Sequence, residues 1–243
     1  MHGMRIDLRP VVAMVAAVLL GGALPRVVPA QIYWTDWTSA TVSNTGSASG
    51  LITTPSGPVT ASYTGQVYAT TQTACGASYW VPTTPYLSSP TVPNAPPPCD
   101  IVTLTGGPTF PANTITFSQP ILNPVMAILS LGQPGVTVTY NFDSPFNILS
   151  FGPGYFGGPG TLQQLTPNVL TGVEGHGVIQ FQGTFSSISW TVPTPETWHG
   201  FTLGIVGVAP PSTTVPEPAT IGLVALGLGG LAVGRRMHHG RRA

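Results

Sequence analysis

The chain has 243 residues, of which only 6% are charged, and its seven basic and seven acidic side chains give a formal net charge of zero. All the basic residues are arginines near the two ends of the sequence: Arg5, Arg9, Arg26, Arg235, Arg236, Arg241 and Arg242. Residues 31–214 contain five carboxylates and no lysine or arginine. Because binding to phosphate groups depends on lysine and arginine, we expect neither nucleic acid nor an anionic lipid surface as a partner of this part.

The first 30 residues have the pattern of a cleaved signal peptide. Arg5 and Arg9 precede an apolar run at residues 11–24, and residues 28–30 (Val-Pro-Ala) place small side chains at positions −3 and −1 of a cleavage site. The apolar run would rise about 21 Å as a helix, which is short of the roughly 30 Å hydrocarbon core of a bilayer. A retained membrane anchor is therefore the less favoured alternative, and we expect signal peptidase to cut between Ala30 and Gln31.

The hydrophobic pattern of residues 31–214 predicts a single domain of β-strands. Apolar and polar residues alternate in short stretches that are rich in β-branched and aromatic side chains, whereas residues 125–131 are mostly apolar, as in a strand buried on both faces. The predicted strands are 59–64, 66–70, 114–117, 125–131, 136–140, 178–181, 187–192 and 201–208. Glycine and proline turns separate them. This pattern predicts an all-β fold, and we expect a jelly-roll-like β-sandwich.

The two cysteines of the chain, Cys75 and Cys99, are predicted to form a disulfide, because an exported chain meets an oxidising compartment. The bond would close a proline-rich loop. Closing a loop of this size contributes about 3 kcal/mol in the chain-entropy model, and less here because the prolines already restrict the unfolded chain. A metal site is the alternative, but it would need further ligands and no histidine lies close in the sequence.

Aromatic residues in the loops are candidates for stacking on sugar rings. Among them, Trp80 in the cysteine loop and Tyr155 in a Gly-Pro loop are the residues that we expect to be exposed. Tryptophan and tyrosine also fill the cores of sandwiches, and we assign Trp190 to the core because it lies within a strand-like alternation.

Two segments combine a glutamate with a histidine. Glu174 and His176 lie in a glycine-rich segment before a predicted strand, and Glu196 and His199 follow two prolines. Such pairs can bind metal or transfer protons. Solvated turns are commoner, so we expect both segments at the surface, with Trp198 partly packed.

A third polar segment, formed by Asn141, Asp143 and Ser144, offers oxygen ligands of the kind that calcium prefers. Asp-Ser-Pro also initiates turns, and we favour that interpretation. Five carboxylates leave a glycosidase pair open as an alternative, but the common motifs of serine hydrolases, zinc proteases and phosphate-binding loops do not occur in this sequence. We expect a non-enzymatic protein without a catalytic residue, a cofactor or a metal site.

The end of the chain has three parts in a fixed order. The motif residues Val215, Pro216, Glu217 and Pro218 precede a glycine-rich apolar run at 221–234, and the basic residues Arg235, Arg236, Arg241 and Arg242 follow. This order resembles the PEP-CTERM sorting signal of exported bacterial proteins, here at residues 215–243. The prolines keep the motif extended, the apolar run is expected to be a single transmembrane helix, and the arginines would hold its end in the cytoplasm.

The resemblance implies that an exosortase processes the chain at or near the Pro-Glu-Pro motif while the tail anchors it transiently in the inner membrane. Proteins of this kind are associated with the cell surface, exopolysaccharide and the biofilm matrix. We therefore predict an exported surface or matrix protein with polysaccharide contact. The alternatives are an exported glycan hydrolase, a purely structural surface protein, and a C-terminal anchor that is never cut.

Overall fold

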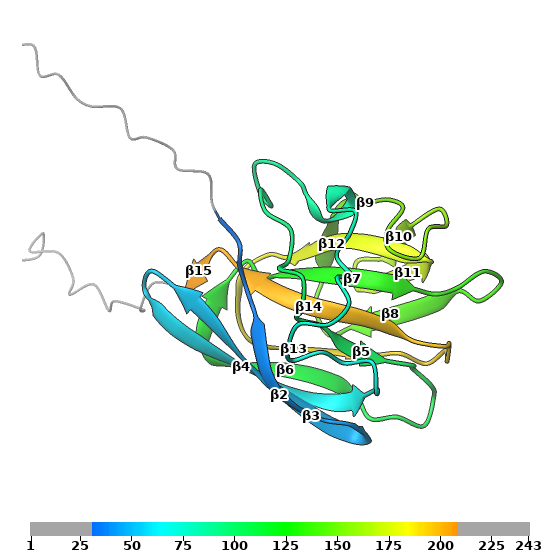
Figure 1. Cartoon of the computed structure of the whole chain (residues 1–243), viewed down its shortest axis with the longest axis horizontal. Helices are drawn as coiled ribbons and strands as arrows, with labels where there is room; N and C mark the ends of the chain where they lie inside the picture. Colours follow the sequence, from blue (N-terminus) through cyan, green and yellow to red (C-terminus); the bar gives the residue numbers. More distant parts are fainter. Residues whose placement is uncertain (1–30, 209–243) are drawn as a thin grey trace, which may run out of the picture.

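Alternation of inward apolar and outward polar side chains builds several strands of this protein, of which the computed structural model describes residues 31–208. In strand β4 (Gly57–Val67), for example, Val59, Ala61 and Tyr63 are buried and the residues between them are exposed. A strand with this pattern has one face on the core and one in water. The result is two antiparallel sheets that face each other across a shared apolar interior (Figure 1).

The smaller sheet has the strand order β1-β14-β7-β12-β9, with β5 also paired to β14. Its strands are β1 (Tyr33–Trp34), β5 (Val102–Leu104), β7 (Val125–Leu131), β9 (Phe146–Phe151), β12 (Gly175–Phe181) and β14 (His199–Ile205). All seven residues of β7 are buried, as predicted from its apolar run. The long segment between β4 and β5, which includes the short 3-10 helix η1 (Thr84–Tyr86), covers the outer side of this sheet.

The larger sheet has the order β10-β11-β8-β13-β6-β4-β3-β2, with β15 also paired to β6. Besides β4, its strands are β2 (Asp36–Thr41), β3 (Ser43–Thr54), β6 (Asn113–Leu122), β8 (Val138–Phe142), β10 (Thr161–Thr166), β11 (Val169–Val173), β13 (Thr184–Thr191) and β15 (Gly207–Val208). The prediction of an all-β, sandwich-like fold is confirmed. The strands β1–β3, β5 and β9–β11 were not predicted, and the expected strand at 66–70 ends at Val67.

Aromatic rings fill the space between the two sheets. Trp190 of β13 packs against Phe201 of β14, with ring centroids 5.0 Å apart and the planes nearly perpendicular. Tyr63 of β4 lies 5.3 Å from the same phenylalanine. Edge-to-face pairs of this kind stabilise beyond the burial of their area. The assignment of Trp190 to the core is confirmed, since it is 1% exposed.

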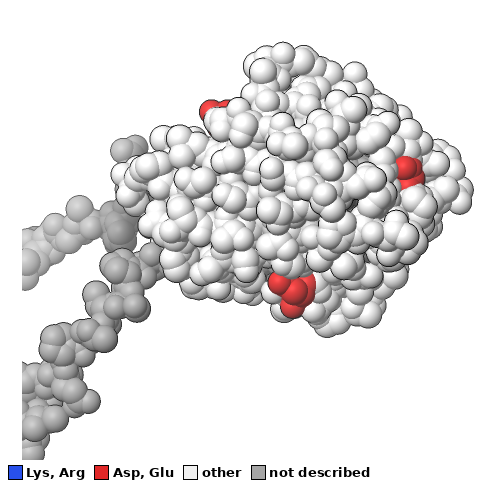
Figure 2. Space-filling view, turned by 90° about the horizontal axis from the view of Figure 1, so that it is seen from below, with Lys and Arg blue, Asp and Glu red and all other residues white. Residues whose placement is uncertain are grey.

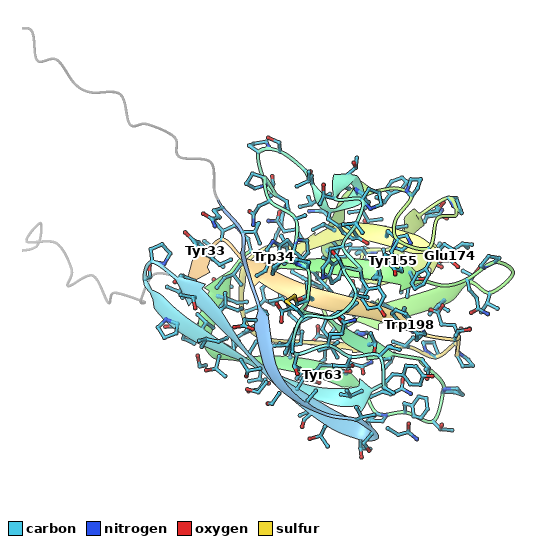
Figure 3. The ribbon with its side chains drawn as sticks, in the orientation of Figure 1. Tyr33, Trp34, Tyr63, Tyr155, Glu174 and Trp198 are labelled. Carbon is cyan, nitrogen blue, oxygen red and sulfur yellow. A yellow bond between two sulfur atoms is a disulfide. The ribbon has the colours of Figure 1, made fainter. Side chains whose placement is uncertain are left out.

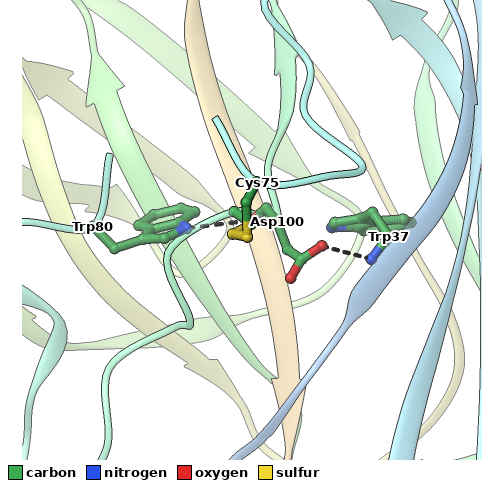
Figure 4. The surroundings of a disulfide bond; sticks show 5 residues. Trp37, Cys75, Trp80 and Asp100 are labelled. Carbon is green, nitrogen blue, oxygen red and sulfur yellow. Dashed lines mark hydrogen bonds between the residues drawn. A yellow bond between two sulfur atoms is a disulfide. The ribbon is translucent and has the colours of Figure 1, made fainter. Parts of the chain in front are cut away.

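The predicted disulfide is also present. Cys75 and Cys99 are bonded, with their Cα atoms 4.4 Å apart, and the bond closes the covering segment over the smaller sheet. Next to it, Asp100 joins two parts of the fold: its Oδ1 accepts a hydrogen bond from the backbone N–H of Trp37 (3.0 Å), and its carbonyl accepts one from the indole N–H of Trp80 (3.2 Å) (Figure 4). Burial raises the pKa of the Asp100 carboxyl to about 6.

The expectation that Trp80 is exposed is wrong. Its side chain is 2% exposed and packs edge to face on Tyr86, 5.1 Å between centroids, in a second apolar cluster outside the smaller sheet. The covering segment needs its own apolar residues to hold it on the outer face of β7, and Trp80 is the largest of them. A tryptophan buried in this way cannot stack on a sugar ring.

Candidate functional site

A pocket of about 330 Å³ opens at one end of the smaller sheet, where β7 ends and β12 begins. Its lining comes from segments far apart in the sequence: Ser130, Gln133, Phe156, Glu174, Glu196, Thr197 and Trp198. We call it the acidic pocket, because two of the protein's carboxylates line it. Glu174, Tyr155 and Trp198 lie together at this end of the molecule (Figure 3).

Unusual backbone conformations bring the first carboxylate into the pocket. Glu174 is the one residue between β11 and β12, with φ 49°, and Ser130 in β7 has φ 56°. The pairing of β12 with β7 shifts register at the same point, between Gly175 and Gly177. The hydroxyl of Ser130 donates to Oε2 of Glu174 at 2.9 Å. Left-handed conformations of non-glycine residues cost about 1 kcal/mol or more and concentrate at functional sites.

The second carboxylate is held more rigidly. Oε1 of Glu196 accepts a hydrogen bond from the backbone N–H of Gly132 at 2.8 Å, and the Glu196 side chain is only 1% exposed. The same oxygen lies 2.6 Å from Nδ1 of His199, which is fully buried. This contact lacks the direction of a hydrogen bond, so we regard the Gly132 N–H as the main anchor of the carboxylate.

The surroundings of Glu174 raise the pKa of its carboxyl. Burial raises the pKa of the Glu174 carboxyl, the negative charge of Glu196 raises it further, and only the hydrogen bond from Ser130 opposes these effects. This carboxyl shares the pocket with the Glu196 side chain, which the backbone N–H of Gly132 holds in place. Together with the Ser130 hydroxyl and the Gln133 amide, these groups can both donate and accept hydrogen bonds to a hydroxylated ligand.

The sequence predicted both Glu-His segments at the surface, and that expectation is wrong. His176 and His199 are fully buried in β12 and β14, and both glutamates are drawn inward with them. His176 is tied to Tyr86 and to the backbone of Ser130: its Nδ1 accepts the Ser130 N–H at 3.2 Å and lies 3.2 Å from the Tyr86 hydroxyl. Burial lowers the pKa of His176 to about 4. At neutral pH the His176 ring is therefore uncharged. Its hydrogen bond with the backbone N–H of Ser130 helps to hold Ser130 in position.

An aromatic cluster adjoins the acidic pocket: two of its rings, Phe156 and Trp198, line the pocket, and Tyr79 and Tyr155 pack against them. Tyr79, Tyr155, Phe156 and Trp198 come from three separate loops, and their ring centroids lie 5.0 Å (Tyr79–Tyr155), 5.3 Å (Tyr79–Trp198) and 5.3 Å (Phe156–Trp198) apart. We call these four residues the aromatic wall. Tyr155 and Phe156 are 43% and 46% exposed. The predicted exposure of Tyr155 is confirmed, and Tyr79 takes the place in the wall that the sequence suggested for its neighbour Trp80.

Of the other predicted sites, Asp143 and Ser144 connect β8 to β9, and Oδ2 of Asp143 accepts the backbone N–H of Ser189 at 3.2 Å. Within residues 31–208 no three His, Cys, Asp or Glu side chains lie close enough together to hold a metal ion. The sequence interpretation missed Ser130 and Gln133 as parts of the pocket. Ser130 could have been noticed as the one polar residue in the apolar run 125–131.

Comparison with known families accounts for the end of the chain. Residues 214–242 match the PEP-CTERM protein-sorting motif, so the chain carries this motif, and the motif marks an exported protein that an exosortase sorts. No curated protein and no solved structure matches the chain. Ala30, the Pro-Glu-Pro motif and the terminal arginines lie outside the described residues. Within those residues, we find no helix with the length and apolar character that a membrane span requires.

Proposed function

We propose that this exported protein acts at the cell surface or in the extracellular matrix as a non-enzymatic polysaccharide-binding protein, with the acidic pocket and the aromatic wall as its binding site. The observation that carries the proposal is a cluster of four packed aromatic rings, two of which line a pocket together with Ser130, Gln133, Glu174 and Glu196. Ligand sites typically combine apolar and aromatic walls with a few convergent polar groups.

The chemistry of the pocket favours a neutral, hydroxylated ligand. Carboxylate, amide and hydroxyl groups exchange hydrogen bonds with sugar hydroxyls, and the aromatic faces offer apolar contact to the ring C–H groups. An anionic ligand would meet two acidic side chains, and among residues 31–208 it would find no lysine or arginine. Neutral sugars are therefore the ligand class that we assign to this site.

We propose the following route to this location on the strength of the sorting motif and of the sequence pattern. Signal peptidase cuts before Gln31, the apolar run after Pro218 spans the inner membrane transiently as a helix, and exosortase then acts at the Pro-Glu-Pro motif. The product released is residues 31–214, which form one domain. For the fold of this domain we keep the proposal of a jelly-roll-like β-sandwich. The intact mass of the protein recovered from its native host tests both cleavage sites, and a full-length mass would contradict the route.

Retention on immobilised polysaccharides tests the binding site. The change Trp198→Ala, which removes one ring of the aromatic wall, is expected to weaken retention by about tenfold or more, because tryptophan contacts dominate many interfaces. Phe151→Ala is the control, since Phe151 is an exposed aromatic residue that lies in β9, outside the acidic pocket. Loss of retention in both variants, or no retention of the unchanged protein on any polysaccharide, would contradict the proposal.

A glycan hydrolase is the second candidate, and the paired carboxylates favour it. Glu174, whose pKa is raised, would protonate the leaving oxygen, and Glu196 would act as base or nucleophile. The change Glu174→Gln would then abolish release of reducing sugar while retention on the polysaccharide persists. If the unchanged protein releases no reducing sugar from any polysaccharide that it binds, the hydrolase is excluded and the binding protein stands.

A further inference from the structure

The outward face of the larger sheet carries a second polar surface, separate from the acidic pocket. Five adjacent strands, β2, β3, β4, β6 and β13, each place two serines or threonines opposite those of the next strand. The first row is Ser39, Ser49, Ser62, Thr116 and Ser187, and the second is Thr41, Ser47, Thr64, Thr114 and Ser189. We call them the hydroxyl rows. Every one of these ten positions is serine or threonine.

The pairing of the strands places all ten side chains on one face. Residues opposite each other in an antiparallel pair point to the same side, and the residues that alternate with them, such as Ala48, Ala61, Ile115 and Ile188, are buried in the core. All ten hydroxyl residues are exposed or half-buried. Within this set of ten described residues, only Thr114 and Ser189 are joined by a hydrogen bond between their hydroxyls (2.9 Å).

The rows form a long, narrow array. Neighbouring strands lie about 4.8 Å apart and alternate residues along a strand about 6.8 Å apart, so five strands and two rows cover about 19 Å by 7 Å. The array stops after two rows, since the next outward positions include Leu51 on β3 and Asp36 on β2. An array of this shape fits one chain-like ligand that crosses the strands. A two-dimensional lattice such as an ice surface would need further rows.

The surface is also hollowed where β2, β3 and β4 meet. A depression of about 290 Å³ is lined there by Ser39, Ala40, Thr41, Ser47, Ala48, Ser49, Ser62, Tyr63 and Thr64, and none of these residues carries a charge. Seen from the side on which β2 and β3 lie in Figure 1, the molecule shows isolated acidic groups and no basic ones (Figure 2). A charged ligand would find no partner in the depression, whereas hydroxyls can donate and accept with any neutral polyol.

We propose that the hydroxyl rows bind an extended, uncharged polysaccharide chain that lies across the five strands. This contact is independent of the acidic pocket, which is formed by the smaller sheet and its loops. One protein molecule could then hold a polysaccharide at two places. Once the first contact has formed, the effective concentration of the polysaccharide at the second is high, so the overall affinity rises.

Four forms of the exported protein test the proposal on dextran and mixed-linkage β-glucan as neutral probes, and on alginate as an anionic one. They are the unchanged protein, the combined variant S49A/S62A/T64V/T116V, the pocket variant W198A, and the control T161V/T166V, which removes exposed hydroxyls from β10 of the same sheet. Valine has the shape of threonine and suits strands, so near-UV circular dichroism is expected to stay unchanged.

The combined variant is expected to lose affinity for the neutral polysaccharides by about tenfold or more, because several ligand hydrogen bonds disappear together. The control is expected to bind as the unchanged protein does. In a fifth form, which joins W198A to the combined variant, the residual binding of W198A is expected to disappear. Binding is also expected to be insensitive to salt, since no charges take part.

Wild-type affinity in the folded combined variant would overturn the proposal. If W198A alone abolishes all binding, the acidic pocket is the whole site, so the proposed function stands and the hydroxyl rows have no part in it. If the combined variant loses binding while W198A does not, the rows stand and the pocket proposal fails. A protein that shapes ice crystals and binds no polysaccharide would overturn both.

Discussion

The acidic pocket and the hydroxyl rows are polar surfaces of the same domain, but their backbones differ in kind. In the pocket, Ser130 and Glu174 have left-handed backbone conformations, and the strands beneath them shift register. In the rows, five strands keep their pairing over two alternate residues. Irregular backbone can aim a few side chains at one point, whereas regular backbone repeats one side chain over an extended surface. The comparison predicts that single changes will damage the pocket far more than the rows.

The largest effect is expected at a glycine of the pocket. Gly132 has φ +77°, and a Cβ there would lie 2.2 Å from the carbonyl oxygen of Gly172. The change Gly132→Ala therefore combines strain with a backbone clash, and it should destabilise the fold by about 3 kcal/mol or more. It also displaces the N–H that holds Glu196. Urea unfolding measures the loss.

Gly135→Ala is the matched control for this change. Gly135 has a similar φ of +82°, but no atom lies within 4 Å of the position of its Cβ. Its replacement should cost only about 1 kcal/mol, from backbone strain alone. Equal losses for the two variants would mean that close packing around Gly132 does not define the pocket.

Removal of the disulfide should have the next largest effect. The double change Cys75→Ser and Cys99→Ser is expected to cost about 2–3 kcal/mol, because the covering segment is no longer closed in the unfolded chain. Since Tyr79 of the aromatic wall lies in this segment, binding at the pocket should weaken as well. Binding through the hydroxyl rows should persist, and a loss confined to the rows would contradict the separation of the two surfaces.

The pH dependence of stability should show two opposing groups. The pKa of Asp100 is raised to about 6, so the stability that its protonated form contributes is lost as the pH rises from about 4 to 6. The pKa of His176 is lowered to about 4, so its contribution is present above pH 6.5 and is lost as the pH falls to 4. The two slopes oppose each other and partly cancel in the unchanged protein, while the raised pKa of Glu174 adds a further contribution that is lost as the pH rises.

Removing either group should reveal the slope of the other. Relative to the unchanged protein, Asp100→Asn should shift the slope of stability against pH upward between about 4 and 6, by up to about 1.4 kcal/mol per pH unit. His176→Gln should shift it downward between about 4 and 6. Denaturant midpoints measured at several pH values give the slopes, which are independent of a uniform loss of packing. If the free energy of unfolding changes with pH in the same way in both variants, Asp100 and His176 are not the two opposing groups.

The smallest effect is expected in the hydroxyl rows. Thr64→Val removes one exposed hydroxyl and should change the free energy of unfolding by less than about 0.5 kcal/mol. Ser130→Ala, which removes one hydroxyl from the pocket and with it the hydrogen bond to Glu174, should cost about 1 kcal/mol or more. Thermal melting of the two variants side by side decides whether the pocket is the more sensitive surface.

Much of the fold could be predicted because alternation is a local property. The alternation of Val59, Ala61 and Tyr63 with polar residues predicts β4 without any other information. The apolar run 125–131 likewise predicts a strand buried on both faces. Strand β3 could not be predicted, since its first half contains, apart from one threonine, only Ser, Asn, Gly and Ala, residues with little intrinsic preference for strands. Pairing with β2 on one side and β4 on the other holds it in place.

The candidate site was predicted only in fragments. The sequence drew attention to Glu174, Glu196 and Tyr155, but it placed the two glutamates in separate surface loops. They share a pocket because the turn after β11 and the loop before β14 dock at the same end of β7, beside Gly132. Similarly, nothing local shows which of the neighbours Tyr79 and Trp80 turns inward, since that depends on the sheet that their loop covers.

The sequence by itself determined that this protein is exported and sorted, and it determined the class of its fold. The sorting motif at 214–242, the cysteine pair and the alternation of the main strands are all visible without coordinates, because each depends on residues close together or on one simple pairing. Only the tertiary structure decided where the polar groups meet. Strand register aligned ten hydroxyls, and the shifted register of β7 and β12 joined two distant glutamates, because such positions depend on hydrogen bonds between segments far apart in the chain.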